Sequence, residues 1–143
     1  MQEQRWGGCV CRKVRYSIDG MPLRVTICHC SWCQRRTGSA FGVELVFEKA
    51  QVSIPSDMAS IYRHISDNSG RWLDQYFCGT CGSNIGLTLE AVPSIQSIAV
   101  GSLDDPCWPE LARLDCRHVF VRSARRWSEI PGDVEQFEEH FRE

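Results

Sequence analysis

The chain has 143 residues, of which 43% are hydrophobic and 24% charged, and its formal net charge is −2. This size suits one globular domain over residues 1–143, and the balanced composition argues against a disordered, collagen-like or membrane-spanning chain. The small net charge provides no general attraction to nucleic acid or to an anionic membrane, so neither is expected as a partner.

The cysteine content is the most unusual feature of the composition. The N-terminal segment from Met1 to Trp6 lacks the apolar core of a secretory signal, which predicts a cytoplasmic location. In a reducing compartment, nine cysteines indicate metal binding rather than disulfides, and an odd number fits a complete set of disulfides poorly.

Residues 10–18 alternate in polarity, which predicts a half-buried strand with Cys9 and Cys11 on one face. Residues 19–22 carry a turn signal, and alternation resumes over residues 23–27. We expect the two strands to pair as a hairpin. The apolar face of the first strand would consist of Val10, Val14, Tyr16 and Ile18.

β-branched and aromatic residues predict further short strands along the rest of the chain. A turn over residues 67–70 separates two of them. The predicted strands cover residues 39–47, 52–54, 60–65, 72–77, 85–89, 95–100 and 116–121.

The C-terminal segment predicts a short helix. Asp133 is a suitable N-cap, and Gln136 stands at the third position of a capping box. Val134, Phe137 and Phe141 follow at helical spacing. The predicted fold is therefore mainly β, built from short antiparallel strands with one short C-terminal helix.

Three cysteines in a C-x-C-x2-C spacing, Cys28, Cys30 and Cys33, predict a metal site, which we call the central cluster. On an extended segment the first two point to the same side, and the C-x2-C pair aims two thiolates at a tetrahedral ion. Three thiolates leave one position open on a zinc ion, as in sites that bind a substrate.

Four other cysteines form two pairs that flank the central cluster, Cys9 with Cys11 and Cys78 with Cys81. Seven cysteines divide naturally into a closed site of four and an open site of three. Spacing alone leaves open whether the late pair joins the early pair or the central cluster.

The layout of these motifs resembles the family of glutathione-dependent formaldehyde-activating enzymes, whose domain also occurs in centromere protein V. The resemblance rests on residues 7–11, on CHCSWCQRRTGSAF over 28–41 and on FCGTCGSNIG over 77–86. It continues in HVFV over 118–121 and in Trp127. The chain departs from the founding enzyme directly after Cys33, over residues 34–38.

The resemblance implies a small zinc-stapled antiparallel β fold of the β-tent type with two zinc ions per chain. A structural zinc is implied at Cys9, Cys11, Cys78 and Cys81. A catalytic zinc is implied at Cys28, Cys30 and Cys33.

The function implied by the resemblance is that of a carbon–sulfur lyase with small-molecule substrates. Such an enzyme adds glutathione, as co-substrate, to formaldehyde or a related small aldehyde and is S-(hydroxymethyl)glutathione synthase-like. A zinc ion with three thiolates suits a soft ligand such as a thiol better than a hydrolytic water. Arg35 and Arg36 are expected to bind a glutathione carboxylate. Two alternatives are a non-catalytic zinc-binding carrier or sensor, and an interaction module with two structural zinc ions. The oligomeric state stays open.

Several single residues near or between the motifs have structural interpretations. We expect Cys107 and Cys116 to be buried hydrophobes, and His29 to face away from the metal. His118 is expected to be a core or edge histidine of a strand. Trp32 is expected either to pack in the core or to line the substrate pocket.

Overall fold

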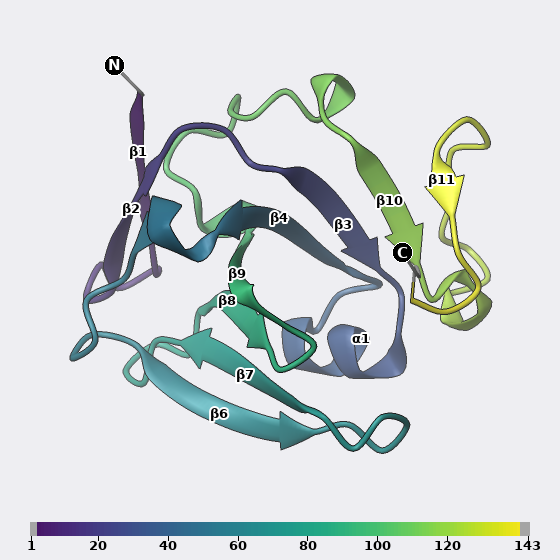
Figure 1. Ribbon diagram of the computed structural model, residues 1–143, viewed down its shortest axis with the longest axis horizontal. Coiled ribbons are helices and arrows are strands. Elements are labelled where there is room, and N and C mark those ends of the chain that lie inside the picture. Colours follow the sequence, from purple (N-terminus) through teal and green to yellow (C-terminus); the bar gives the residue numbers. More distant parts are fainter. Residues whose placement is uncertain (1–2, 141–143) are drawn as a thin grey trace.

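The computed structural model describes residues 3–140 of the chain, whose eleven strands form two sheets (Figure 1). The predicted mainly β fold is confirmed. The three-stranded sheet has the order β1 (Gln4–Gly8), β2 (Arg15–Asp19), β5 (Val52–Ser53). The eight-stranded sheet has the order β11 (Glu135–Gln136), β10 (Cys116–Val119), β3 (Arg24–Cys28), β4 (Gly42–Glu48), β9 (Val92–Ala99), β8 (Asn84–Leu89), β7 (Trp72–Phe77), β6 (Ser60–Ile65).

One α-helix, α1 (Ser31–Thr37), follows β3 directly. The Cys30 sulfur accepts a hydrogen bond from the Cys33 backbone N–H at 3.2 Å and thereby caps its first turn. The helix ends at Gly38, whose φ of 68° is the left-handed conformation that glycine adopts without strain. The other helical segments are four 3-10 turns, η1 (Lys49–Gln51), η2 (Val100–Ser102), η3 (Leu111–Arg113) and η4 (Val121–Ser123).

The predicted hairpin of the first two strands is wrong. β2 pairs with β1 and β5, whereas β3 pairs with β4 and β10 in the other sheet. Residues 9–14 form a turn rather than a strand, and Val10 is 87% exposed in it. This turn allows β1 to pair with one edge of β2. β1 is polar and rich in glycine, and no alternation of polar and apolar residues predicts it.

The predicted C-terminal helix is also wrong. Residues 133–140 form turns, bends and the short strand β11, which pairs in parallel with β10. Phe137 donates its N–H to the His118 carbonyl at 2.9 Å, and Val121 donates to the Phe137 carbonyl at 3.1 Å. A helix this short is marginal by itself, and the end of β10 offers backbone partners instead. Phe141, the last residue of the predicted apolar stripe, lies outside the described residues.

The other predicted strands are confirmed with shifted ends, as β3 to β10. The expectation of antiparallel pairing holds for β3 with β4 and for the succession from β4 through β9, β8 and β7 to β6. It fails at β10, which runs parallel to both of its neighbours. The C-terminal part of the chain therefore lies beside β3, close to the central cluster (Figure 1).

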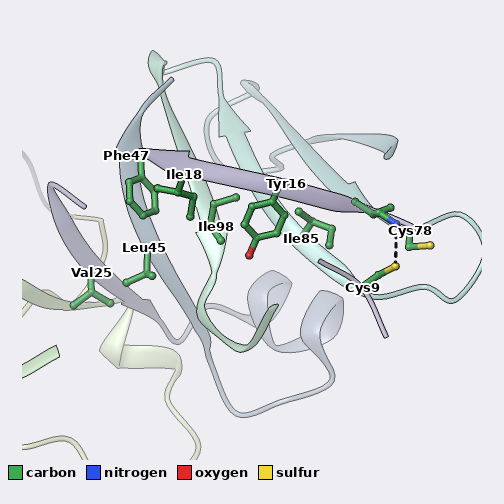
Figure 2. Packing of buried hydrophobic residues seen from close by; sticks show 10 residues of the cluster. Cys9, Tyr16, Ile18, Val25, Leu45, Phe47, Cys78, Ile85 and Ile98 are labelled. Atoms are coloured by element: carbon green, nitrogen blue, oxygen red, sulfur yellow. Dashed lines mark hydrogen bonds between the residues drawn. The ribbon is translucent and has the colours of Figure 1, made fainter. Parts of the chain in front are cut away.

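The hydrophobic core lies between the two sheets (Figure 2). Tyr16 and Ile18 of β2 confirm the apolar face predicted for this strand. The Tyr16 hydroxyl reaches Ser102 Oγ at 2.7 Å, and burial raises the pKa of Tyr16 to about 12. Residues 3–140 contain no helix with the length and apolar character needed to span a bilayer. The core residues of the larger sheet include Val25, Leu45, Phe47, Ile85 and Ile98.

Candidate metal centres

Four cysteines meet where the two sheets come together, and we call them the outer cluster: Cys9, Cys11, Cys78 and Cys81. Their four Sγ atoms lie within 4.8 Å of one another. Sulfur atoms at about 2.3 Å from one tetrahedral ion are separated by about 3.8 Å. The Cys9–Cys11 and Cys11–Cys78 sulfur distances are 3.5 and 3.7 Å, so the geometry fits a zinc ion.

The outer cluster joins segments that are distant in the sequence. Cys9 follows β1 and Cys11 lies in the next turn, whereas the other pair lies in the turn between β7 and β8. The structure thus places the late C-x2-C pair with the early C-x-C pair, which spacing alone left open.

Backbone and hydroxyl groups surround the sulfurs of the outer cluster. The Val14 N–H donates to Cys9 Sγ at 3.2 Å, and Cys81 Sγ lies 3.2 Å from Ser83 Oγ. The hydrogen bond from Ser83 lowers the pKa of Cys81 to about 5. Deprotonated sulfur is the form that binds zinc, so this environment favours metal binding.

The central cluster is assembled at the junction of β3 and α1. Cys28 ends the strand, Cys30 caps the helix and Cys33 lies in its first turn. The three Sγ atoms lie within 4.8 Å of one another. Hydrogen bonds with Cys28, and then with Cys33, lower the pKa of Cys30 to about 3. Hydrogen bonds with Cys30, and then with Cys33, hold the pKa of Cys28 well above its usual range. Of these two thiols, Cys30 is the one whose surroundings favour the thiolate that binds metal.

Within residues 3–140, no histidine, carboxylate or further cysteine joins the central cluster as a fourth ligand. His29, although it lies between two of the cysteines, points away from them, as expected. Its Nε2 lies 2.9 Å from Nδ1 of His118, and both rings are buried. Burial lowers the pKa of both histidines, which favours the neutral rings.

A buried glutamine fixes the loop that carries the central cluster. The Gln34 amide donates to the His29 carbonyl at 2.7 Å and to the Ser123 carbonyl at 3.0 Å. Its Oε1 accepts a hydrogen bond from Arg125 Nε at 2.6 Å. Sequence reasoning missed this residue, because two of its partners lie about 90 residues away in the chain.

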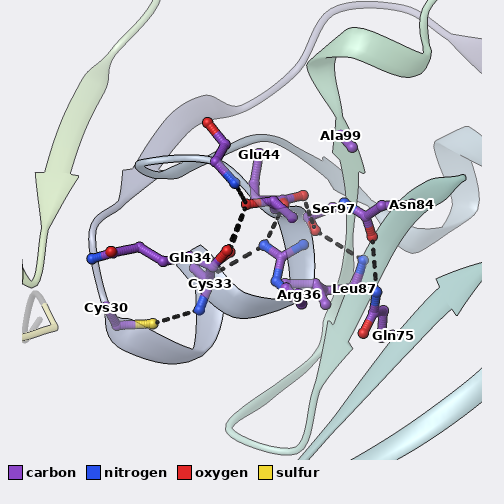
Figure 3. A network of polar contacts seen from close by, with 12 residues as sticks. Cys30, Cys33, Gln34, Arg36, Glu44, Gln75, Asn84, Leu87, Ser97 and Ala99 are labelled. Carbon is purple, nitrogen blue, oxygen red and sulfur yellow. Dashed lines mark hydrogen bonds and ion pairs between the residues drawn. The ribbon is translucent and has the colours of Figure 1, made fainter.

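The two arginines after Cys33 occupy different environments. Arg35 is exposed, and at about 100° per residue it lies on the opposite side of α1 from Cys33. The Arg36 side chain is only 2% exposed, and its Nη2 donates to Glu44 Oε1 at 2.6 Å (Figure 3). The same Nη2 lies 3.5 Å from Cys33 Sγ. Burial alone would lower the pKa of Arg36, but the negative charges of Glu44 and Cys33 raise it.

Trp32, which lies between Cys30 and Cys33 in the chain, makes an aromatic contact. The half-buried Trp32 stacks on His64 of β6 with a centroid distance of 5.1 Å and an interplanar angle of 17°. The Arg36 guanidinium lies 5.2 Å from the Trp32 ring. Trp32 thus packs against two neighbours, and it does so beside the sulfurs.

The two remaining cysteines belong to neither cluster. Cys107 is exposed, which corrects the expectation that it is a buried hydrophobe, and Cys116 is half-buried in β10. All nine cysteines are free thiols.

Comparisons with known proteins give a family match and a similar fold. The family model described as glutathione-dependent formaldehyde-activating enzyme matches residues 4–123. No curated protein sequence matches the chain. Among solved structures, a structural-genomics crystal structure of a Rhodobacter sphaeroides protein is similar, with a TM-score of 0.55 and 20% identity. The match covers 69% of this chain and 87% of that chain, and likeness at this identity shows the fold alone.

Proposed function

The chain belongs to the family of glutathione-dependent formaldehyde-activating enzymes, and we propose that it is a carbon–sulfur lyase that adds glutathione to formaldehyde or a related small aldehyde. In this reaction the thiol sulfur bonds to the carbonyl carbon, and the π electron pair moves to the oxygen. The thiol proton ends on that oxygen, which gives S-(hydroxymethyl)glutathione. The reverse direction breaks the carbon–sulfur bond.

The observation that carries the proposal is the difference between the two clusters. The outer cluster has four sulfur ligands and suits a closed, structural zinc site. The central cluster gathers three sulfurs, which suits a second zinc site with an open position. A zinc ion held there would supply Lewis-acid stabilisation for a soft ligand such as a thiol. We therefore propose two zinc ions per chain.

The residues around the central cluster have separate roles in the proposal. Cys28, Cys30 and Cys33 hold the metal, and the stacked Trp32–His64 pair fixes the position of Trp32 between two of these ligands in the chain. We propose that Arg35 binds a glutathione carboxylate at a distance from the metal, because its side chain is exposed on the side of α1 opposite to Cys33. Arg36 was expected to share this role, but its ion pair with Glu44 would have to break first.

The proposed partners are the two small molecules, and the proposed location is the cytoplasm. A reducing compartment keeps free thiols available for metal binding, and all nine cysteines are free.

Two measurements on the same protein test the proposal. Elemental analysis should find about two zinc ions per chain, because the chain provides two separate sulfur clusters. Exchange NMR should show that the protein accelerates the formation and cleavage of S-(hydroxymethyl)glutathione above the spontaneous rate. Cys30→Ser should remove the acceleration, whereas Cys107→Ser, a change at an exposed cysteine outside both clusters, should not. A protein with two zinc ions and no acceleration would be a carrier or sensor instead.

A further inference from the structure

We infer that Arg36 is a positioning residue for the central metal. Its guanidinium donates a hydrogen bond to the sulfur of Cys33 and thereby reduces the charge that this sulfur donates to the metal. The inference rests on the proposed function in one respect, because it assumes that the central cluster holds a metal. It assigns to Arg36 a role other than contact with glutathione.

The contact is between a buried cation and a sulfur that binds metal as a thiolate. Arg36 Nη2 lies 3.5 Å from Cys33 Sγ, and the arginine side chain is 2% exposed. Hydrogen bonds to an ionised acceptor are stronger than neutral ones, and a water-poor environment strengthens them further. The hydrogen bond withdraws electron density from the thiolate, so the thiolate donates less charge to a metal.

Neighbouring residues hold the guanidinium in place. Glu44 accepts from Nη2 at 2.6 Å, and its other oxygen accepts from Ser97 Oγ at 2.9 Å. Ser97 Oγ in turn accepts the Leu87 N–H at 3.1 Å, so the network reaches β8 (Figure 3). At Gly42 a Cβ atom would lie 2.8 Å from Nη2, and the glycine therefore leaves the space that the arginine occupies.

The arrangement is costly, which indicates a role beyond stability. Arg36 Nε and Nη1 are buried and have no hydrogen-bond partner among the described residues. Buried donors without partners destabilise a fold, and a buried ion pair is often no more stabilising than apolar residues of similar volume. The ion pair with Glu44 alone does not explain why the Arg36 guanidinium is buried at this position. Contact with a metal-binding thiolate does explain it.

The outer cluster has no such cation among the described residues. Its sulfurs accept from backbone N–H groups and contact the Ser83 hydroxyl. The nearby Lys13 Nζ donates to Thr80 Oγ1 at 3.2 Å rather than to a sulfur. The two clusters therefore use the same ligand type but differ electronically. A metal in the central cluster receives less charge from its ligands and retains more affinity for an added thiol.

Cobalt(II) in place of zinc makes this difference measurable. The sulfur-to-cobalt charge-transfer band of the central site is identified as the absorption that Cys30→Ser removes. In Arg36→Met this band should move to longer wavelength, because loss of the hydrogen bond raises the energy of the sulfur electrons. Zinc affinity of the central site should fall by roughly 10- to 100-fold, because without the neighbouring cation the Cys33 sulfur binds a proton more readily in competition with the metal. Arg36→Lys, which keeps a cationic donor, should give an intermediate shift, and the exposed matched control Arg35→Met should give none.

The design separates folding from tuning. Arg36→Met leaves Glu44 buried without its partner, so the double variant Arg36→Met/Glu44→Gln is measured alongside it, with circular dichroism as the check on folding. An unshifted band in either folded variant overturns the inference and leaves the proposed function intact. If the wild-type protein shows no band that Cys30→Ser removes, the central cluster binds no cobalt. That result would overturn both the inference and the central metal site of the proposed function.

Discussion

Nε2 of His29 and Nδ1 of His118 lie 2.9 Å apart, although 89 residues separate them in the chain. The rings stack with a centroid distance of 5.2 Å, and the backbone N–H of His29 donates to the Val119 carbonyl at 3.0 Å. Only one proton fits between the two nitrogens, since a second would place two N–H groups against each other. The contact ties the loop of the central cluster to β10 and requires that at least one of the two rings be neutral.

This contact predicts that the free energy of unfolding decreases as the pH falls below about 6.5. Burial lowers the pKa of His118 in the folded state, so the unfolded chain binds more protons between the two pKa values. The stabilisation is complete above the unfolded pKa and is lost as the pH falls toward the folded one. Denaturant titrations across this range should show a shallower decline for His118→Gln, which keeps a polar partner for His29. Equal slopes for both proteins would contradict the prediction.

The two clusters should respond differently to loss of one cysteine. Cys78→Ser should give molten or insoluble protein, because the outer cluster joins two sheets. A structural zinc contributes about 10–16 kcal/mol, comparable with the roughly 5–15 kcal/mol net stability of a domain. Cys30→Ser should stay folded with about one zinc ion, because the central cluster spans only Cys28 to Cys33 and serine is also a good N-cap. Melting curves and zinc content of the two variants test this prediction. If Cys30→Ser unfolded while Cys78→Ser stayed folded, the assignment of the structural and the catalytic cluster would be reversed.

Arg35→Ala should weaken glutathione binding. A charge-assisted hydrogen bond to a carboxylate contributes about 1.5 kcal/mol at the lower end of its range, which corresponds to roughly a tenfold higher Kd. Arg35 is exposed, and solvent screens its charge, so we expect an increase in Kd of tenfold or less. Calorimetry with cysteamine, a thiol without a carboxylate, should show no difference between variant and wild type. An unchanged Kd for glutathione would contradict the prediction and show that Arg35 does not bind the carboxylate.

Gly86→Ala should destabilise the larger sheet. A Cβ atom at Gly86 would lie 1.9 Å from the Ser97 carbonyl oxygen, so the backbone of β8 or β9 would have to move. Overpacking of this kind costs about 1–3 kcal/mol. Gly101→Ala is the matched control, since no atom lies within 4 Å of a Cβ there, and it should change the stability by less than about 0.5 kcal/mol. Denaturant unfolding of both variants measures the difference, and equal stabilities would contradict the prediction.

The strands and the cysteine motifs were predictable because their signals are local. Tyr16 and Ile18 alternate with polar residues because one face of β2 is buried. The seven clustered cysteines stand in short motifs, so their grouping into candidate metal sites could be predicted before their positions in space were known.

The features that escaped prediction depend on partners distant in the sequence. The C-terminal segment has helical spacing, but β10 competes for its backbone hydrogen bonds. Gln34 and Arg36 gave no sign of their roles, because Arg125, Ser123 and Glu44 reach them only in the folded chain. Helix α1 is short, and it is capped by Cys30, a residue that the pattern assigns to metal binding.

The parallel pairing of β10 with β3 forms late during synthesis, after the three cysteines of the central cluster have been translated. Cys28 is in register with Val119, so the ribosome must add the whole intervening chain before β3 gains this neighbour. At about 5–20 residues per second, this interval is on the order of 10 seconds. The thiols of the central cluster exist throughout that time without the backbone support of β10. The proposed metal site therefore gains β10 as a neighbour only after residue 119 has been translated.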